Sequence, residues 1–241
     1  MSATMLIARR ELGTYLRSMT GYVIAAILLL VDGLLFNIFA IGGDDKLSAV
    51  VLAQFFFYTS GLTMIASVFI SMRLVAEERQ TGTLVLLTSS PVMDGQIIVG
   101  KFLSGFLFLA MVLGLTLFMP LLILVNGKVS VGHLVAGYLG LLLLGAASTA
   151  IGTLGSALAR TQVLAAIFSG CMITAMVLCW MLVKVTERPF NDVFASLAIH
   201  GKHFLPFQQG LLNTRDVVYY FSVTFLFLLL TTHVLQARRW R

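Results

Sequence analysis

The sequence contains 241 residues, of which 59% are apolar and 11% are charged, and its mean hydropathy is +0.99. So few charges leave too little polar surface to coat a globular domain in water, and this excludes a soluble protein. Sixteen Lys and Arg residues against ten Asp and Glu residues give a net charge of +6, but they occur in short clusters between long apolar runs, so the basic excess indicates membrane topology and not nucleic-acid binding.

The N-terminal segment, residues 4–19, has the period of an amphipathic helix. Its apolar residues recur every three or four positions, and polar residues occupy the other faces. A basic helix of this kind lies in the membrane interface, parallel to the bilayer. The alternative is a basic stretch without a fixed structure. The apolar positions are Met5, Ala8, Leu12, Leu16 and Met19, and the polar positions are Arg10, Glu11, Thr14 and Arg17.

Six apolar runs are long enough to cross a bilayer as helices, which needs about 20 residues each. The first run is too long for the apolar region of a signal peptide, and no small-residue cleavage site follows it. None of the runs shows the alternating polarity of a membrane β-strand. The sequence therefore predicts an all-α integral membrane protein, with residues 1–241 as a single transmembrane domain. The six spans are expected at 22–41, 50–72, 102–125, 134–158, 163–183 and 217–236.

The first span contains an acidic residue, Asp32, near the centre of the bilayer. An ionised carboxylate is costly there and should face protein or water. Two interpretations remain open. Asp32 could belong to a translocation surface or a subunit interface, together with Asn37 one and a half turns away, or it could be a protonated side chain that hydrogen-bonds to a neighbouring helix.

The segment between the second and third spans is long for a helical bundle and carries its own helix signals. Gly82 can end a helix, and Pro91 is favoured in the first turn of the next one. Between them, residues 83–89 are expected to form a short helix with Leu84 and Leu87 on one face. Such a helix would present a compact apolar ridge to a partner. The charged residues that precede it are Glu77, Glu78 and Arg79.

Residues 95–101 resemble a phosphate-binding loop in spacing only. Gly95 and Gly100 fit the pattern, but Phe102 replaces the hydroxyl residue that would bind magnesium, and no strand precedes the segment. Any ATP chemistry is therefore expected in another subunit.

The fourth span carries small residues at spacings of three and four. Small residues on one face let helices approach closely in lipid, so this stripe is expected to serve bundle packing, or alternatively to line a helix pair that moves during transport. Its members are Gly145, Ser148, Gly152, Ser156 and Ala159, with Gly155 beside them.

Residues 184–216, between the fifth and sixth spans, are expected to form short helices on the outer surface. Asn191 is expected to cap one of them at its N-terminus, where Asp192 suits the helix dipole. Two nearby histidines, His200 and His203, are weak evidence for a metal site, because clustered cysteine or carboxylate ligands are missing. We expect no catalytic residue, no metal and no directly bound cofactor, which indicates a non-enzymatic subunit. The apolar face of the capped helix would comprise Val193, Phe194, Leu197 and Ala198.

Both chain termini are expected in the cytoplasm. Ten of the sixteen Lys and Arg residues fall on the side of the membrane that holds the termini, and four of the other six belong to the long segment 184–216. Positive charges in short loops mark the cytoplasmic side. The protein is therefore expected in the cytoplasmic (inner) membrane, which it crosses several times.

The residues around Gly82 follow a pattern of a glutamate, a Gly-Thr-Leu triplet, a second leucine and a proline. This pattern resembles that of ABC-2 type permeases, and the resemblance covers the whole chain, including the amphipathic leader, the six spans and the outer loop. The C-terminal stretches 210–221 and 234–241 are most similar to the gliding-motility (Gld-type) branch, which is similar to the nitrous-oxide-reductase maturation permeases. The residues that carry the central pattern are Glu78, Gly82, Thr83, Leu84, Leu87 and Pro91.

The resemblance implies a permease that couples ATP hydrolysis by a separate subunit to export or to mechanical work. It implies a dimer of ABC ATP-binding subunits, which would hold ATP and Mg, and a second permease copy or a paralogue. It leaves room for an auxiliary extracytoplasmic or membrane-anchored subunit; the lipid bilayer is a further partner and nucleic acid is not. The segment after Gly82 would be the cytoplasmic coupling helix, with Glu77, Glu78 and Arg79 as the polar rim of the ATPase dock.

The alternative from another functional class is an ATPase-independent secondary transporter or a membrane scaffold. Secondary carriers usually show internal repeats and polar groups at the midplane of broken spans. The sequence shows no repeat between its halves, and Asp32 is the one acidic residue within its spans. The coupled permease is therefore the favoured interpretation.

Overall fold

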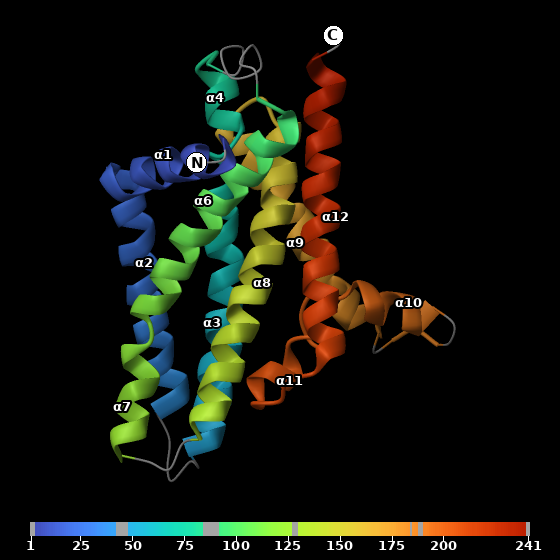
Figure 1. Cartoon of the computed structure of the whole chain (residues 1–241). Coiled ribbons are helices and arrows are strands. Elements are labelled where there is room, and N and C mark those ends of the chain that lie inside the picture. Colours follow the sequence, from blue (N-terminus) through green and yellow to red (C-terminus); the bar gives the residue numbers. More distant parts are fainter. Residues whose placement is uncertain are drawn as a thin grey trace.

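The computed structural model describes residues 3–41, 48–83, 92–126, 130–183, 185–187 and 190–239. Within these ranges every regular element is helical, and six helices are long and apolar enough to cross a membrane (Figure 1). The fold class predicted from the sequence is therefore confirmed. The six candidate spans are Met19–Ile38, Ser48–Gln80, Asp94–Ile123, Val131–Leu158, Gln162–Val183 and Thr214–Ala237.

The long helices lie side by side as a bundle, and α1 lies across one end of it (Figure 1). The helix α4 and the last turns of α12 are at the same end, which we call the α4 end; the opposite end, toward which α11 lies, we call the α11 end. The elements are α1 (Ala3–Arg17), α2 (Met19–Leu35), the π-helical η1 (Phe36–Ile41), α3 (Ser48–Ser71), α4 (Ala76–Gln80), α6 (Asp94–Leu115), α7 (Phe118–Asn126), α8 (Val131–Leu158), α9 (Gln162–Val183), α10 (Phe190–Leu197), α11 (Leu205–Gln208) and α12 (Thr214–Arg239).

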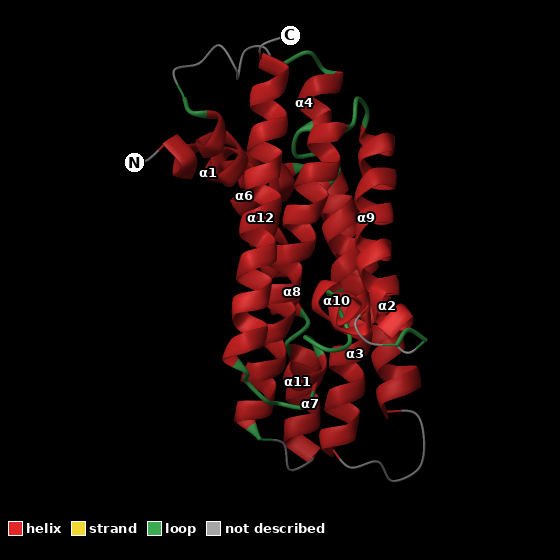
Figure 2. Ribbon diagram, turned by 90° about the vertical axis from the view of Figure 1, so that its right-hand side faces the viewer, coloured by secondary structure: helices red, strands yellow, loops and turns green. Residues whose placement is uncertain are grey.

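The helix α8 is the most deeply buried of the candidate spans and packs against α3, α6, α9 and α12 (Figures 1 and 2). Its small residues permit this close packing. Gly152 lies against Ser71 of α3, and Gly155 lies against Ser169 of α9, so that an added methyl group at either glycine would clash. These small residues contact different neighbouring helices, which favours the interpretation of the stripe as a packing surface.

The third span begins earlier than predicted and is interrupted before its end. The helix α6 starts at Asp94, whereas the span was expected from residue 102, because the stretch up to Lys101 is helical and lies beneath α1. Farther along, Pro120 lacks the backbone N–H that would bond to the carbonyl of Thr116. A turn accordingly separates α6 from α7.

The segment between α9 and α12 contains the short helices α10 and α11, as expected for residues 184–216. The predicted capping role of Asn191 is wrong, because α10 begins at Phe190 and Asn191 lies within it. Its side-chain amide instead donates hydrogen bonds to the carbonyl oxygens of Val183 at 2.8 Å and Thr186 at 3.2 Å. Carbonyl groups at a helix C-terminus have no partner within the helix, so they can accept hydrogen bonds from a nearby side chain. Through these bonds Asn191 joins α10 to the end of α9.

Candidate functional site

A buried lysine lies where α1 crosses α6. At the crossing α6 carries Gly100, and a methyl group added there would lie 2.9 Å from the backbone oxygen of Thr4 and 3.0 Å from Ile7. The missing side chain therefore lets α1 approach the backbone of α6. The next residue, Lys101, is only 1% exposed. A buried ammonium group needs charged or hydrogen-bonding partners.

Two carboxylates neutralise Lys101. Its Nζ lies 2.8 Å from Oε1 of Glu78 in α4 and 3.4 Å from Oε1 of Glu11 in α1. Arg10 of α1 joins the group, because its Nη2 lies 2.7 Å from Oε1 of Glu11 and 3.5 Å from Oε1 of Glu78. These four residues form what we call the Lys101 cluster. It joins α1, α4 and α6 through two cations and two anions.

The charges of the Lys101 cluster shift the pKa values of Glu11 and Arg10. Burial by itself raises the pKa of Glu11, but Lys101 and Arg10 outweigh this effect and hold the pKa below its ordinary value. The hydrogen bond to Glu11 raises the pKa of Arg10, although partial burial acts in the opposite direction. The second oxygen of Glu78, Oε2, is buried and has no hydrogen-bond partner in the described part of the chain. The Glu78 carboxylate therefore depends on its ion pairs for compensation.

A second ion pair fixes the start of α4. Arg73 Nε lies 2.7 Å from Glu77 Oε2, and Arg73 Nη2 lies 3.0 Å from Glu77 Oε1, so the pair is bidentate. Arg73 also donates to the hydroxyl of Thr20 in α2, and its guanidinium carbon lies 5.9 Å from the ring centroid of Tyr15 in α1. Tyr15 in turn donates to the carbonyl oxygen of Ile70 at 2.7 Å. These contacts join α1 and α2 to the end of α3.

The end of α8 supports α4 from another side. The hydroxyl oxygen of Ser156 accepts hydrogen bonds from the backbone N–H groups of Val75 at 3.1 Å and Ala76 at 3.0 Å. It thereby supplies the cap that α4 does not obtain from a side chain at its own N-cap position. Arg79 donates from Nη1 to the carbonyl oxygen of Ala159 at 2.9 Å. The helix α4 is therefore held by α8 as well as by the ion pairs.

The three charged residues predicted to rim a partner's dock, Glu77, Glu78 and Arg79, all make contacts within the chain and hold α4 against the bundle. The roles of Ser156 and Lys101 could not be predicted from the sequence, because both residues lie far from α4 along the chain. The one local signal was the spacing of four residues between Arg73 and Glu77, which favours an ion pair on a helix.

The chain turns directly after α4. The helix ends at Gln80, and Gly82 has a φ of 76°, in the left-handed region that favours glycine. Thr83 is the last described residue of this stretch, and its hydroxyl donates to the carbonyl oxygen of Glu78 at 3.3 Å. The rest of the predicted coupling helix lies outside the described residues. This applies to Leu84, Leu87 and Pro91.

Asp32 lies inside the bundle. It is 3% exposed, and the hydroxyl of Thr59 in α3 donates to its Oδ1 at 2.8 Å. Its Oδ2 is buried without a partner among the described residues, beside a cavity of about 20 Å³ that Thr63 and Thr116 also line and that is large enough for one water. Asn37, in contrast, is exposed. Asp32 therefore has a hydrogen-bond partner on a neighbouring helix, and its buried position differs from the exposed position of Asn37.

Two buried histidines lie toward the α11 end and have different partners. His200 Nε2 lies 2.9 Å from the hydroxyl oxygen of Ser60 in α3, and His203 Nδ1 lies 2.7 Å from Oδ1 of Asp216 in α12. Burial lowers the pKa of both rings, although Asp216 opposes the shift at His203. Across the described ranges, no three His, Cys, Asp or Glu residues come together in a way that could hold a metal ion. The two histidines therefore anchor the α10–α11 segment to α3 and α12.

The α4 end has the geometry of a stiff mechanical joint. The helix α4 is connected by short polar contacts to α1, α6 and α8, and most of these contacts involve a charged group. A displacement of the residues that follow α4 would therefore reach α1 and two long helices of the bundle, α6 and α8.

A family model described as "ABC-2 family transporter protein" matches residues 5–237. The matched range runs from the first turn of α1 into the last turns of α12, and so it includes the Lys101 cluster and all six candidate spans. No curated protein matches the chain.

Proposed function

The chain belongs to the ABC-2 family of transporter proteins, and we propose that it transmits the work of ATP hydrolysis in a partner subunit to its own spans, for export or for mechanical work across the membrane. Proteins of this family are membrane subunits that lack an ATPase domain, and membership implies a separate ATP-binding partner. ATP and Mg are proposed to bind in that partner.

In the proposed orientation, the α4 end faces the cytoplasm, and both termini lie there. The support for this orientation is the distribution of Lys and Arg residues, ten of which fall on the side that holds the termini. Cytoplasmic loops carry the excess of basic residues in membrane proteins. The proposed location is the cytoplasmic (inner) membrane.

The observation that carries the proposal is the Lys101 cluster, which lies at the base of the stretch proposed to dock on the ATPase. When the docked stretch moves, α4 moves first, because Gly82 joins the two directly. The motion of α4 then reaches α6 through the ion pair of Glu78 with Lys101. It reaches α8 through the hydrogen bond from the backbone of Ala76 to Ser156. Energy from ATP-driven closure of the partner would enter the spans by this route.

The proposed assembly contains two permease subunits. An ATPase that closes as a dimer presents two docks related by symmetry, so each dock needs its own permease, either a second copy of this chain or a paralogue. The stretches 210–221 and 234–241 support a place in the gliding-motility branch, which is similar to the nitrous-oxide-reductase maturation permeases. An auxiliary extracytoplasmic or membrane-anchored subunit would complete such an assembly.

The double substitution Leu84→Asp, Leu87→Asp is expected to weaken binding of the ATPase subunit by at least about 30-fold, without impairing membrane insertion. A few apolar anchors dominate an interface of this kind, and each new carboxylate would lose its hydration without gaining a partner. The measurement is co-purification of the tagged chain with the ATPase encoded beside it, together with ATPase turnover of the purified complex.

The matched control is Leu211→Asp, Leu212→Asp, which changes two exposed leucines in the turn before α12. This variant should bind the ATPase normally. If the Leu84→Asp, Leu87→Asp chain also co-purifies and turns over normally, the docking assignment is wrong. A chain that transports without any ATPase would support the secondary-transporter alternative.

A further inference from the structure

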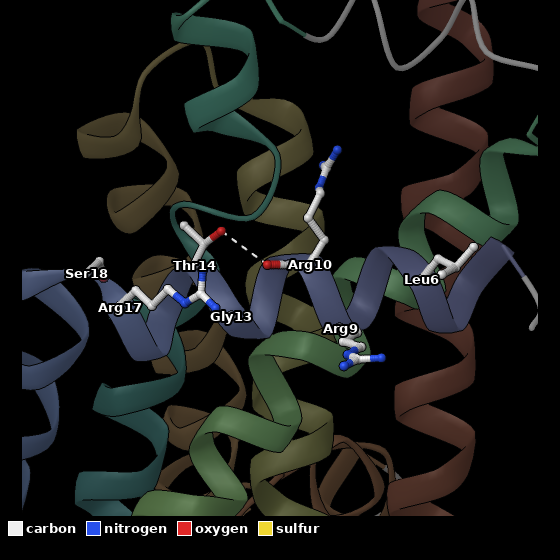
Figure 3. A pocket seen from close by; sticks show the side chains of 7 residues that line it. All are labelled: Leu6, Arg9, Arg10, Gly13, Thr14, Arg17 and Ser18. Atoms are coloured by element: carbon white, nitrogen blue, oxygen red, sulfur yellow. Dashed lines mark hydrogen bonds between the residues drawn. The ribbon is translucent and has the colours of Figure 1, made fainter.

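The side of α1 that faces away from α6 carries two arginines without an acidic partner. Arg9, Gly13 and Arg17 follow one another at intervals of four residues and so lie along one face of the helix. Neither Arg9 nor Arg17 forms an ion pair with any residue that the structure describes, whereas Arg10 pairs with Glu11. Figure 3 shows Arg17 extending along the helix toward Gly13, while Arg9 and Arg10 point to opposite sides of it.

These residues line an open groove of about 680 Å³ on α1. Gly13 leaves its floor free, because a methyl group added there would meet nothing within 4 Å. Arg9 and Arg17 are about 12 Å apart along the helix, so two long side chains can reach from both ends toward one group above Gly13. Both arginines line the same groove, so their side chains can approach one group bound there. Its lining also includes Leu6, Arg10, Thr14 and Ser18.

The groove lies where polar and apolar surfaces meet. The helix α1 crosses the end of the bundle and joins the first span directly after Ser18 (Figure 1). Large apolar side chains are exposed close by in the sequence, among them Leu6 and Met19, the latter 83% exposed. Unpaired cations next to exposed apolar side chains fit the boundary between the acyl chains and the headgroups of a bilayer, which is where phospholipid phosphates lie.

We propose that Arg9 and Arg17 bind the phosphate of an anionic phospholipid such as phosphatidylglycerol, above Gly13. Guanidinium groups form paired, charge-assisted hydrogen bonds with phosphate, and no described carboxylate pairs with these two. An acidic protein surface fits the groove less well, because it would leave the adjoining apolar side chains of Leu6 and Met19 without lipid. The lipid comes from the leaflet at the α4 end.

A lipid bound at this site would set the depth of α1 in the membrane. Because the Lys101 cluster joins α1 to α4, the bound lipid would also set the resting position of α4. This consequence rests on the proposed function. The lipid site itself does not, since Arg9 and Arg17 would bind phosphate whether or not an ATPase docks beyond α4.

The test is lipid binding by the purified full-length chain in detergent. Fluorescent phosphatidylglycerol is titrated into the wild type and into the double variant Arg9→Gln, Arg17→Gln, with fluorescent phosphatidylcholine as the neutral lipid and inorganic phosphate as a competitor. Each arginine near an anionic lipid strengthens binding about fivefold, so the double variant should bind phosphatidylglycerol about 25-fold more weakly. Its weak binding of phosphatidylcholine should not change.

Two further variants separate charge from folding. Arg9→Lys, Arg17→Lys keeps the charge and should retain most of the affinity for phosphatidylglycerol. Arg160→Gln removes an exposed arginine from the turn between α8 and α9 and should have no effect. Thermal unfolding of each variant establishes that the fold is intact.

Equal affinity of the wild type and the Arg9→Gln, Arg17→Gln variant for phosphatidylglycerol would overturn the proposal, and so would an equal loss in Arg160→Gln. Displacement of the lipid by an equal concentration of inorganic phosphate would assign the groove to free phosphate. If the Arg9→Gln, Arg17→Gln variant binds phosphatidylglycerol normally but no longer co-purifies with the ATPase, the groove is a protein contact and not a lipid site. Because the titration contains no ATPase, its failure is distinct from a failure of the proposed coupling.

Discussion

Replacing Lys101 with methionine is expected to destabilise the chain by about 3 to 5 kcal/mol, the range typical of removing one partner from a buried ion pair. The Lys101 side chain is 2% exposed, and its Nζ lies 2.8 Å from Glu78. Methionine retains much of the apolar contact but not the ammonium group, so Glu78 and Glu11 lose their principal compensation. Thermal unfolding of the purified chain measures the loss of stability, and ATPase stimulation measures the loss of coupling.

A triple variant separates the charges from the packing. Adding Glu11→Gln and Glu78→Gln to Lys101→Met removes the uncompensated carboxylates and should restore most of the stability, because replacing a whole buried ion-pair network with neutral groups is often neutral. Coupling should stay impaired, because the contacts between α1, α4 and α6 are still missing. Lys202→Met, at an exposed position, is the matched control. A Lys101→Met chain as stable as the wild type would show that the cluster does not hold these helices together.

Gly155→Ala is expected to destabilise the chain by about 1 to 3 kcal/mol, as overpacking of a well-packed contact usually does. The added methyl group would lie 2.8 Å from the backbone nitrogen of Ser169 and would also meet its hydroxyl. That hydroxyl is held in place, because it donates to the carbonyl oxygen of Gly152 at 3.1 Å. Relief therefore requires α9 to move away from α8, next to the Ser156 side chain that supports α4.

Gly170→Ala on α9 is the matched control for this substitution. A methyl group at Gly170 would meet nothing within 4 Å. Alanine is favoured over glycine in a helix by up to about 1 kcal/mol, so this change should be neutral or stabilising. The thermal unfolding temperature of Gly155→Ala should therefore fall below that of the wild type, whereas that of Gly170→Ala should stay the same or rise. Equal shifts would mean that the contact between α8 and α9 does not require a glycine.

The spans and α1 could be predicted because hydropathy and helical period depend on residues that are close together in the chain. The contacts between helices could not, because they depend on which faces meet after packing. Asp32 finds its partner in Thr59 of α3, and the N–H of Ala76 finds its acceptor in Ser156, 80 residues later. No local pattern contains either pairing.

Residues 95–101 show that a local pattern does not specify the contacts that its residues make. In the sequence, Gly100 and Lys101 belong to an incomplete phosphate-binding pattern. In the structure, Gly100 allows α1 to cross α6 closely, and Lys101 pairs with two carboxylates. Asn191 was expected to cap a helix, but its side chain hydrogen-bonds to the end of α9. In each case the residue type was informative, but its partner lies on an element whose position the sequence does not specify.

Cysteine cross-linking to the ATPase subunit tests the central claim most directly, because it reports which end of the bundle the ATPase contacts. In a background with Cys171→Ala and Cys179→Ala, Thr83→Cys places a thiol at the first residue of the proposed dock, and Asn213→Cys places one in the turn between α11 and α12. With a bifunctional thiol reagent in native membranes, we expect cross-links from Thr83→Cys, with a yield that changes when ATP is added, and none from Asn213→Cys. Cross-links from Asn213→Cys, or none from Thr83→Cys, would contradict the account.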